Sequence, residues 1–428
     1  MPDYLKKQCL TLLKASSWSQ ANLAAFGLMV WFFAMPWSLF LLTLSMILLS
    51  AITFIQGPAD TINGRWKLQL PWAGTSKAFW QDSRFMPLVL LFILPIVNAV
   101  ATENWAEWWV IMRVHLAYLV LPLVFFCLPA LQVKHFRFLV IWVLIISFLS
   151  SGVFVINYVL HFDEFQAKLG MGQPIDMPVS HIRYSLFVAM SILSAIWLLL
   201  KYSTQLQFLI RRLLLILILL TSCFLFILAI RSGIVALLIG VLVLGVLTAW
   251  ERKKWALLLG TIFLVGSLPI AAYYMLPSFK QKIHYALYDI NLLSNDGQND
   301  ASDHDRFNSL KYGWELAKKA PLNGVGLADL RTEIEALHLR DSRKVEVVKL
   351  PHNQFIYYLS GAGMTGLLLF CLAFFWPFYR NRKSLNAYSW CFLLVVLSSF
   401  MVEYNLETSL GAAFFLGFWA LALNKKGF

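Results

Sequence analysis

Long apolar runs recur along almost the whole chain and are separated by polar segments. Most hold about 20 residues, the length that a helix needs to cross a hydrocarbon core about 30 Å thick. The runs rich in Leu, Ile and Phe do not alternate with polar positions, as the strands of a membrane barrel would. A helix also satisfies its own backbone hydrogen bonds in lipid. The pattern therefore predicts an all-α polytopic membrane protein.

About twelve transmembrane helices are predicted from these runs. The first pair, on either side of Pro36, also fits one bent hairpin that re-enters the membrane. Ahead of it, residues 2–17 fit a short amphipathic segment, and no cleavable signal peptide is expected because no small-residue cleavage site follows the first run. The predicted helices cover residues 21–36, 38–55, 85–102, 108–129, 137–160, 182–201, 207–229, 232–249, 255–276, 352–377, 386–402 and 406–424.

The composition agrees with a membrane protein. Hydrophobic residues make up 60% of the 428 positions and charged residues 13%, against about 25% charged in a typical globular chain. The five cysteines form no CxxC pair, and none lies in the long polar stretch at 277–351. A disulfide framework and a thiolate metal site are therefore not expected.

Lys and Arg residues mark alternate connections between the predicted helices. The short connections at 102–107 and 403–408 carry glutamates and neither Lys nor Arg. Because cytoplasmic loops carry the excess of Lys and Arg, these two are predicted to face outward and both termini to be cytoplasmic. Much of the net charge of +13 then faces anionic lipid headgroups, so nucleic-acid binding is not expected. The basic residues assigned inside are Lys6, Lys7, Lys14, Arg65, Lys67, Lys77, Arg84, Lys134, Arg137, Lys201, Arg211, Arg212, Arg252, Lys253, Lys254, Arg380, Arg382, Lys383, Lys425 and Lys426.

Two outward segments, 161–182 and 277–351, are longer than the other connections. The second divides the chain into residues 1–276, with nine helices after the N-terminal interfacial segment, an extracytoplasmic loop domain, and residues 352–428, with the last three helices. Long loops with structure of their own are usually functional. The chemistry of the protein is therefore expected on the outer face.

The long loop is predicted to be mostly helical. One helix is expected over 302–319 and a second over 328–338, on either side of the turn PLNGVGL. Such a turn needs glycines for positive φ or close backbone approach. An apolar stripe predicts that the first helix lies on the membrane or on the bundle. The stripe consists of Phe307, Leu310, Trp314 and Ala317.

Ionisable residues inside or at the rim of a membrane are costly, so each one suggests a function. His352 follows Pro351 at the start of a predicted transmembrane helix. A helix N-terminus disfavours a positive imidazolium, and a neutral His can accept a proton near pH 7. His352 is therefore a candidate general base. The alternative is an interfacial His that bonds a loop carbonyl.

Three arginines lie on the same predicted side as His352. Arg183 begins one helix, Arg231 lies between two apolar runs, and Arg306 lies early on the loop helix. The guanidinium fork matches phosphate oxygens. The alternatives are snorkelling to lipid headgroups for the first two, and pairing with Asp303 or Asp305 for Arg306. A metal site at residues 303–305 is not favoured, because adjacent residues diverge around a helix.

These residue types together indicate glycosyl transfer from a lipid-linked sugar. The arginines would hold a phosphate or pyrophosphate group, and the His would deprotonate an acceptor hydroxyl. Such a reaction needs no nucleotide, metal or other cofactor.

Four motifs occur in order along the second half of the chain: Arg-Ser-Gly at 231–233, Arg306 followed by Trp314, PLNGVGL at 321–327, and His352–Asn353. In this order and spacing they resemble the bacterial O-antigen ligase/polymerase family. The resemblance implies a GT-C-type glycosyltransferase of the bacterial inner membrane. It implies inverting transfer of a glycan from undecaprenyl pyrophosphate to the lipid A–core oligosaccharide, at the periplasmic face.

By matching positions, His352 resembles the family's base. Arg183, Arg231 and Arg306 resemble its essential arginines, which would bind the pyrophosphate, and His181 and Asn353 are candidate supporting residues. The family also contains O-antigen polymerases and protein O-oligosaccharyltransferases, which share the donor and use another acceptor. A transporter of lipid-linked sugars and a structural membrane protein are less favoured, because no internal repeat is evident and the polar residues gather on one face.

Overall fold

The computed structural model describes residues 19–424 apart from 58–59, 62–64, 72–75, 172, 174–176, 295–301 and 342–347. The predicted interfacial segment at 2–17 lies outside the described residues. In the described part, helices account for nearly all regular structure, and the strands β1 (Ile55–Gln56) and β2 (Lys67–Leu68) form one antiparallel pair. The predicted all-α class is confirmed.

Seven helical segments of the described chain are long and apolar enough to cross a membrane, and five further apolar helices are shorter. All twelve coincide with predicted transmembrane helices. Five of them are shorter than a full membrane crossing requires, so the total of twelve crossings stays a prediction. The long segments are Trp105–Cys127 (α6, Trp105–His115, and α7, Ala117–Cys127), α8 (Val133–Leu160), α10 (His181–Tyr202, continued by η5, Ser203–Gln205), α11 (Phe208–Ile227), α12 (Arg231–Arg252), α13 (Trp255–Met275) and α17 (Gln354–Asn381). The short ones are α2 (Gln20–Ala34), α3 (Leu39–Ile52), Met86–Ala101 (η3, Met86–Leu88; α5, Val89–Asn98; η4, Ala99–Ala101), α18 (Ala387–Phe400) and α19 (Ser409–Ala422).

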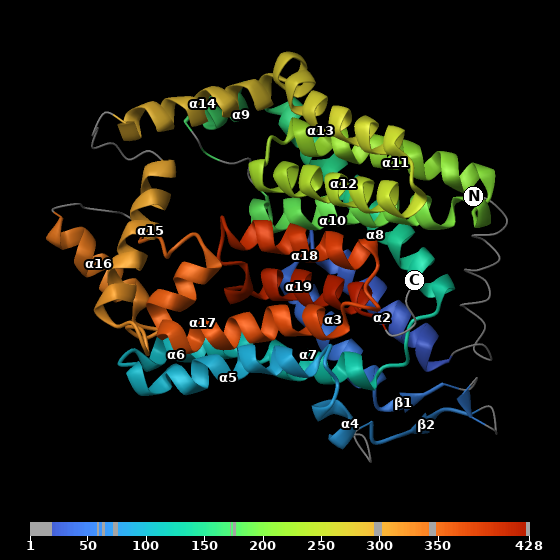
Figure 1. Cartoon of the computed structure of the whole chain (residues 1–428), viewed down its shortest axis with the longest axis horizontal. Helices are drawn as coiled ribbons and strands as arrows, with labels where there is room; N and C mark the ends of the chain where they lie inside the picture. Colours follow the sequence, from blue (N-terminus) through green and yellow to red (C-terminus); the bar gives the residue numbers. More distant parts are fainter. Residues whose placement is uncertain are drawn as a thin grey trace.

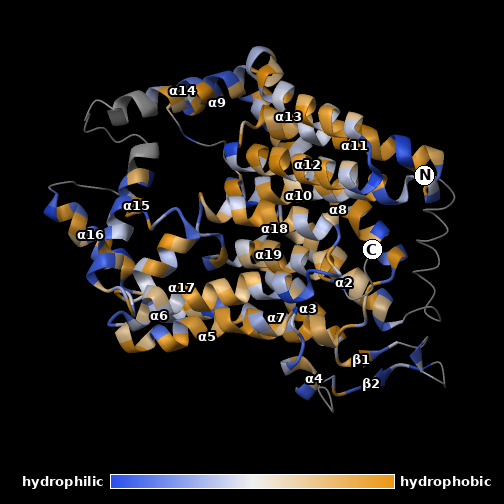
Figure 2. Ribbon diagram, viewed as in Figure 1, coloured by the Kyte–Doolittle hydropathy of each residue, from blue (hydrophilic) through white to orange (hydrophobic). Residues whose placement is uncertain are grey.

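The bundle is organised around α10, in which 15 of 22 residues are buried. The helices run side by side along one axis (Figure 1), and hydrophobic residues dominate them (Figure 2). Small residues bring the helices close: a Cβ on Gly233 would lie 2.4 Å from Ser185 Cβ, and one on Gly240 would lie 2.2 Å from Leu193 Cδ1. Lipid tails are as apolar as the side chains, so this close packing, rather than the hydrophobic effect, holds such helices together.

Polar helices gather at one end of the bundle, here called the loop end (Figures 1 and 2). They are α14 (Pro277–Ser294), α15 (Ser302–Lys319) and α16 (Leu330–Arg340), with α9 (Phe162–Gly170) beside α14; β1, β2 and α4 (Ser76–Trp80) lie at the opposite end. The helix predicted over 302–319 is confirmed, and α16 begins two residues later than predicted. The sequence did not predict α9 and α14.

Only part of the predicted stripe of α15 packs against the bundle. Ala317 is buried together with Tyr312 and Leu316, whereas Phe307 and Trp314 are 56% and 50% exposed, so contact of these two with the membrane stays a prediction. The closest contact is at Gly313, where an added Cβ would lie 2.8 Å from Ile356 Cγ2 and from the ring of Pro351. The missing side chain lets this face of α15 approach α17.

The turn PLNGVGL is a docking element between α15 and α17. Gly324 and Gly326 have φ of 69° and 101°, and α17 is broken at Gly363, whose φ is 66°. Across the break, Gly326 N donates to Gly361 O (2.9 Å) and Met364 N donates to Pro321 O (2.8 Å). The exchange replaces the helical hydrogen bonds that α17 loses at its break.

Candidate functional site

The helix starts that carry three of the predicted residues meet at the loop end. Arg231 is the first residue of α12, Arg183 lies in the first turn of α10, and His352 lies two residues before α17. The connection between α11 and α12 is only Leu228–Ile230, and Ala229 takes the left-handed conformation (φ 51°) to make it. Arg231 is therefore placed by a short, constrained connection at the start of α12.

The sequence predicted that His352 lies in the first turn of its helix. In the structure His352 instead lies just before the helix, which begins at Gln354. Asn353 is the N-cap of α17, and its Oδ1 accepts hydrogen bonds from Phe355 N (2.9 Å) and Ile356 N (3.1 Å). Its Nδ2 donates to Met401 O (3.2 Å). Asn is a preferred cap because its short side chain reaches the free N–H groups. Asn353 thus positions His352 and attaches the start of α17 to the end of α18.

His352 pairs with an acidic residue that the sequence analysis did not single out. Its Nδ1 lies 3.2 Å from Oε2 of Glu403, and the other carboxylate oxygen lies 3.9 Å from Nη2 of Arg183. The Glu403 side chain is only 4% exposed. A buried carboxylate thus joins the predicted base to one of the predicted arginines.

The surroundings of Glu403 favour its ionised form. Burial raises the pKa of this carboxyl group, but the hydrogen bond from His352 and the charges of His352, Arg183 and Arg306 lower it by more. The resulting pKa lies below the ordinary value of 4.5. Glu403 is therefore a carboxylate at neutral pH, and it orients the His352 ring as a hydrogen-bond acceptor.

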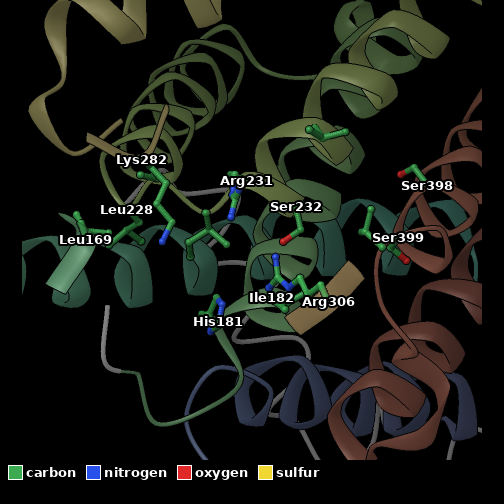
Figure 3. Close-up of a pocket in the computed structure, with 14 residues that line it drawn as sticks. Leu169, His181, Ile182, Leu228, Arg231, Ser232, Lys282, Arg306, Ser398 and Ser399 are labelled. Atoms are coloured by element: carbon green, nitrogen blue, oxygen red, sulfur yellow. The ribbon is translucent and has the colours of Figure 1, made fainter. Parts of the chain in front are cut away.

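A cavity of about 360 Å³ lies next to this cluster. Its basic lining residues come from four elements: His181 on α10, Arg231 on α12, Lys282 on α14 and Arg306 on α15. Figure 3 shows these side chains around one space. The other lining residues that the structure describes are apolar or carry hydroxyl groups: Leu169, Ile182, Leu228, Ala229, Ile230, Ser232, Val235, Ser398, Ser399 and Val402. The cavity suits an anionic group with an apolar attachment.

The His352 cluster and the cavity form one continuous site. Ser309 Oγ accepts a hydrogen bond from His352 N (3.4 Å) and donates to Arg306 O (2.7 Å). Ile182 and Val402, the chain neighbours of Arg183 and Glu403, line the cavity. The structure thus brings all the predicted site residues to one place.

Each residue of the Arg-Ser-Gly motif has a separate role. Arg231 and Ser232 line the cavity, and Ser232 Oγ lies 3.2 Å from Ser185 Oγ on α10. Gly233 leaves room for Ser185, which an added Cβ would overlap. The motif thus holds the arginine and brings α12 against α10 at the site.

A second buried acidic residue, Glu407, fixes the segment that carries Glu403. It accepts hydrogen bonds from Tyr358 Oη (2.6 Å) and Gln354 Nε2 (3.3 Å), and its Oε2 lies 2.8 Å from His115 Nε2. Gln354 Oε1 in turn accepts from Leu406 N (3.0 Å). These contacts connect α6, α17 and the segment after α18, next in the chain to His352 and Glu403.

Among the residues that the structure describes, no three His, Cys, Asp or Glu side chains are grouped to hold a metal ion. The side chains of 303–305, the metal site considered from the sequence, lie outside the description.

Comparison with known proteins gives one family. Residues 213–371 match the family model described as O-antigen ligase. A search of curated proteins found no match. The matched segment contains Arg231, Arg306 and His352, three of the residues on which the resemblance rested. The match confirms that resemblance: residues 213–371 are similar to the O-antigen ligase family.

Proposed function

We propose that the protein is an O-antigen ligase of the bacterial inner membrane. It transfers a glycan from undecaprenyl pyrophosphate to a hydroxyl of the lipid A–core oligosaccharide at the periplasmic face, without a metal or other cofactor. The observation that carries the proposal is the His352–Glu403 pair beside a cavity whose described lining includes His181, Arg231, Lys282 and Arg306. The family match supports the same reaction class.

The cavity is the proposed site of the donor pyrophosphate. Arg231 and Arg306 would bind its oxygens, because guanidinium groups match phosphate in charge and in fork geometry. His181 lines the same cavity and supports this binding. Apolar lining residues such as Leu228, Ile230 and Val402 suit the start of a polyprenyl chain.

His352 is the proposed general base. With Nδ1 donating to Glu403, Nε2 can accept the proton of the acceptor hydroxyl. The hydroxyl oxygen then attacks the anomeric carbon from the face opposite the pyrophosphate, and the bond from that carbon to the pyrophosphate oxygen breaks. The departing pyrophosphate keeps the electron pair, and the arginines stabilise its charge. The anomeric configuration inverts.

Arg183 has a role that the sequence alone did not suggest. Its guanidinium is 12% exposed, lies 3.9 Å from Glu403, and donates through Nη1 to Ser180 Oγ (3.1 Å). Its Nε is buried and has no hydrogen-bond partner among the described residues. Arg183 would keep Glu403 ionised and offer Nε–H to an oxygen of the bound donor.

Complementation tests the proposal in cells. The chain, expressed in a strain that lacks its own ligase, is expected to restore glycan-capped lipopolysaccharide on gels, and His352→Ala is expected to abolish it. His161→Ala replaces an exposed His near the same end and should leave the product unchanged. Capped lipopolysaccharide from His352→Ala would overturn the base assignment. Longer glycans on undecaprenyl pyrophosphate, with none on lipid A–core, would replace the ligase proposal with a polymerase.

A further inference from the structure

We propose that a buried hydrogen-bond network around Glu407 positions the His352–Glu403 pair for proton transfer. Its members act through that pair, so they are positioning residues rather than catalytic ones. The inference rests on the proposed function, since it adds residues to the same site. It is carried by the bonds of the network and by its place in the chain.

The protonation of the His115–Glu407 pair follows from its neighbours. The His115 Nδ1 lies 2.6 Å from Leu91 O, and its Nε2 lies 2.8 Å from Glu407 Oε2. A carbonyl oxygen only accepts, so Nδ1 carries a proton. In a regular helix the N–H four residues later would bond this oxygen, but that residue is Pro95, which has none. A proton must also lie between Nε2 and Oε2, because two bare acceptors at this distance would repel each other.

Glu407 in turn sets the orientation of the Gln354 amide. Glu407 Oε1 accepts hydrogen bonds from Gln354 Nε2 (3.3 Å) and Tyr358 Oη (2.6 Å). With its nitrogen toward Glu407, Gln354 turns its oxygen to Leu406 N and accepts from it (3.0 Å). Leu406 O accepts from Tyr118 Oη (2.9 Å) on α7. The donors Gln354, Tyr358 and Tyr118 are buried, and buried polar groups are costly to leave unpaired.

Both members of the proposed base pair lie within three residues of this network. Gln354 is two residues after His352, and Leu406 is three residues after Glu403. His352 Nδ1 and Glu403 Oε2 are 3.2 Å apart, so a shift of either segment would separate them. Proton transfer depends steeply on such geometry. Neither Glu407 nor Gln354 is among the described residues that line the cavity, so the network should affect kcat and leave donor binding largely unchanged.

The test is glycan transfer by two variants of Glu407 with opposite hydrogen bonding. Glu407→Gln keeps the network, because its amide nitrogen can donate to a neutral His115 while its oxygen still accepts from Gln354. Its kcat should stay close to that of the wild type. Glu407→Leu removes these bonds and should lower kcat at least about tenfold, with little change in KM for the donor. Tyr388→Phe is the matched control, since it removes a buried hydrogen bond to Ser194 Oγ (3.0 Å) at the other end of α18.

Two further measurements separate positioning from a general loss of structure. In a Glu403→Gln protein the base pair is already impaired, so adding Glu407→Leu should lower kcat less than it does in the wild type. The second measurement needs no turnover: diethyl pyrocarbonate modifies His352, and mass spectrometry follows the rate. That rate should rise about threefold in Glu407→Leu, because the ring loses its fixed partner, and should not change in Glu407→Gln.

Four outcomes would overturn the inference. They are a wild-type kcat in Glu407→Leu, equal losses in Glu407→Gln and Glu407→Leu, the same loss from Glu407→Leu with and without Glu403→Gln, and an unchanged modification rate of His352. If Glu407→Leu fails to fold, Gln354→Met decides, because it removes the bonds to Glu407 and Leu406 and should show the same effects. The proposed function falls instead if the folded wild type transfers no glycan, and the modification rate tests the network even then.

Discussion

Glu403 shares its carboxylate between the ring of His352 and the guanidinium of Arg183. Replacement by Gln keeps the shape and removes the charge that stabilises a protonated His352 during the reaction. Glu403→Gln is therefore expected to lower kcat about 10²-fold with a smaller change in KM for the donor. Initial rates of glycan transfer measure this, with Glu103→Gln, an exposed acid at the same end, as the control. Wild-type rates in Glu403→Gln would exclude it from the mechanism.

The same residue predicts a dependence of stability on pH. The pKa of Glu403 in the folded protein lies below its ordinary value of 4.5, mainly because its bond to His352 and nearby positive charges outweigh burial. A depressed pKa contributes stability that is present above the ordinary value and is lost as the pH falls through the folded value. The wild type should therefore lose more thermal stability than Glu403→Gln when the pH falls from about 6 to about 3. Parallel melting curves of the two proteins in detergent would contradict this.

Arg231 should not tolerate lysine. Lysine keeps the charge but lacks the fork that holds two oxygens of a leaving pyrophosphate. Arg231→Lys is expected to reduce kcat/KM for the donor at least about tenfold. Steady-state kinetics measure this loss. A wild-type kcat/KM in Arg231→Lys would mean that Arg231 acts only as a point charge.

The site residues that could be predicted from the sequence differ from the missed ones in their sequence surroundings. Arg231 and His352 could be predicted because ionisable residues beside long apolar runs are unusual. Glu403 was noticed only as part of an acidic connection, since its bond to His352, 51 residues away in the chain, depends on how α17 and α18 pack.

At the scale of elements, the PLNGVGL turn and the break in α17 act as one joint. An added Cβ on Gly324 would lie 2.3 Å from the backbone carbon of Gly361, and its φ of 69° disfavours other residues. Gly324→Ala is therefore expected to destabilise the protein by about 1–3 kcal/mol and to lower transfer. Thermal unfolding measures the loss. Gly266→Ala on α13, where nothing lies within 4 Å of an added Cβ, should not destabilise it.

The helices of the bundle were predictable because each must be apolar over a membrane's thickness. The polar helices at the loop end were harder to predict from the sequence. The sequence of α15 has a clear capping and stop pattern, whereas α9 and α14 lie in segments whose helices pack against each other and against the bundle end. The part of α15 that packs against the bundle was hard to predict, because the close contact is made at Gly313, outside the apolar stripe.

At the scale of the whole molecule, basic residues gather at both ends of the bundle. Arg252 donates to Leu200 O and Arg137 to Gln205 Oε1, so three of the basic connections predicted as cytoplasmic lie together. The basic cavity is lined by residues of α10, α12, α14 and α15 at the loop end.

This arrangement predicts labelling of opposite sides of the membrane. In a background without the five native cysteines, Lys318→Cys should react with an impermeant maleimide in spheroplasts. Lys253→Cys should react only after permeabilisation. Both positions are exposed, so access alone does not separate them, and the reverse pattern would contradict a periplasmic site.

The most direct measurement is glycan transfer by the purified protein. The reaction contains undecaprenyl-pyrophosphate-linked glycan and rough lipopolysaccharide, with EDTA present, and is run with the wild type and with His352→Ala. The account predicts glycan on lipid A–core with the wild type, unaffected by EDTA, and at least about 10²-fold less with the variant. Absence of transfer by the folded wild type, or equal transfer by both proteins, would contradict it.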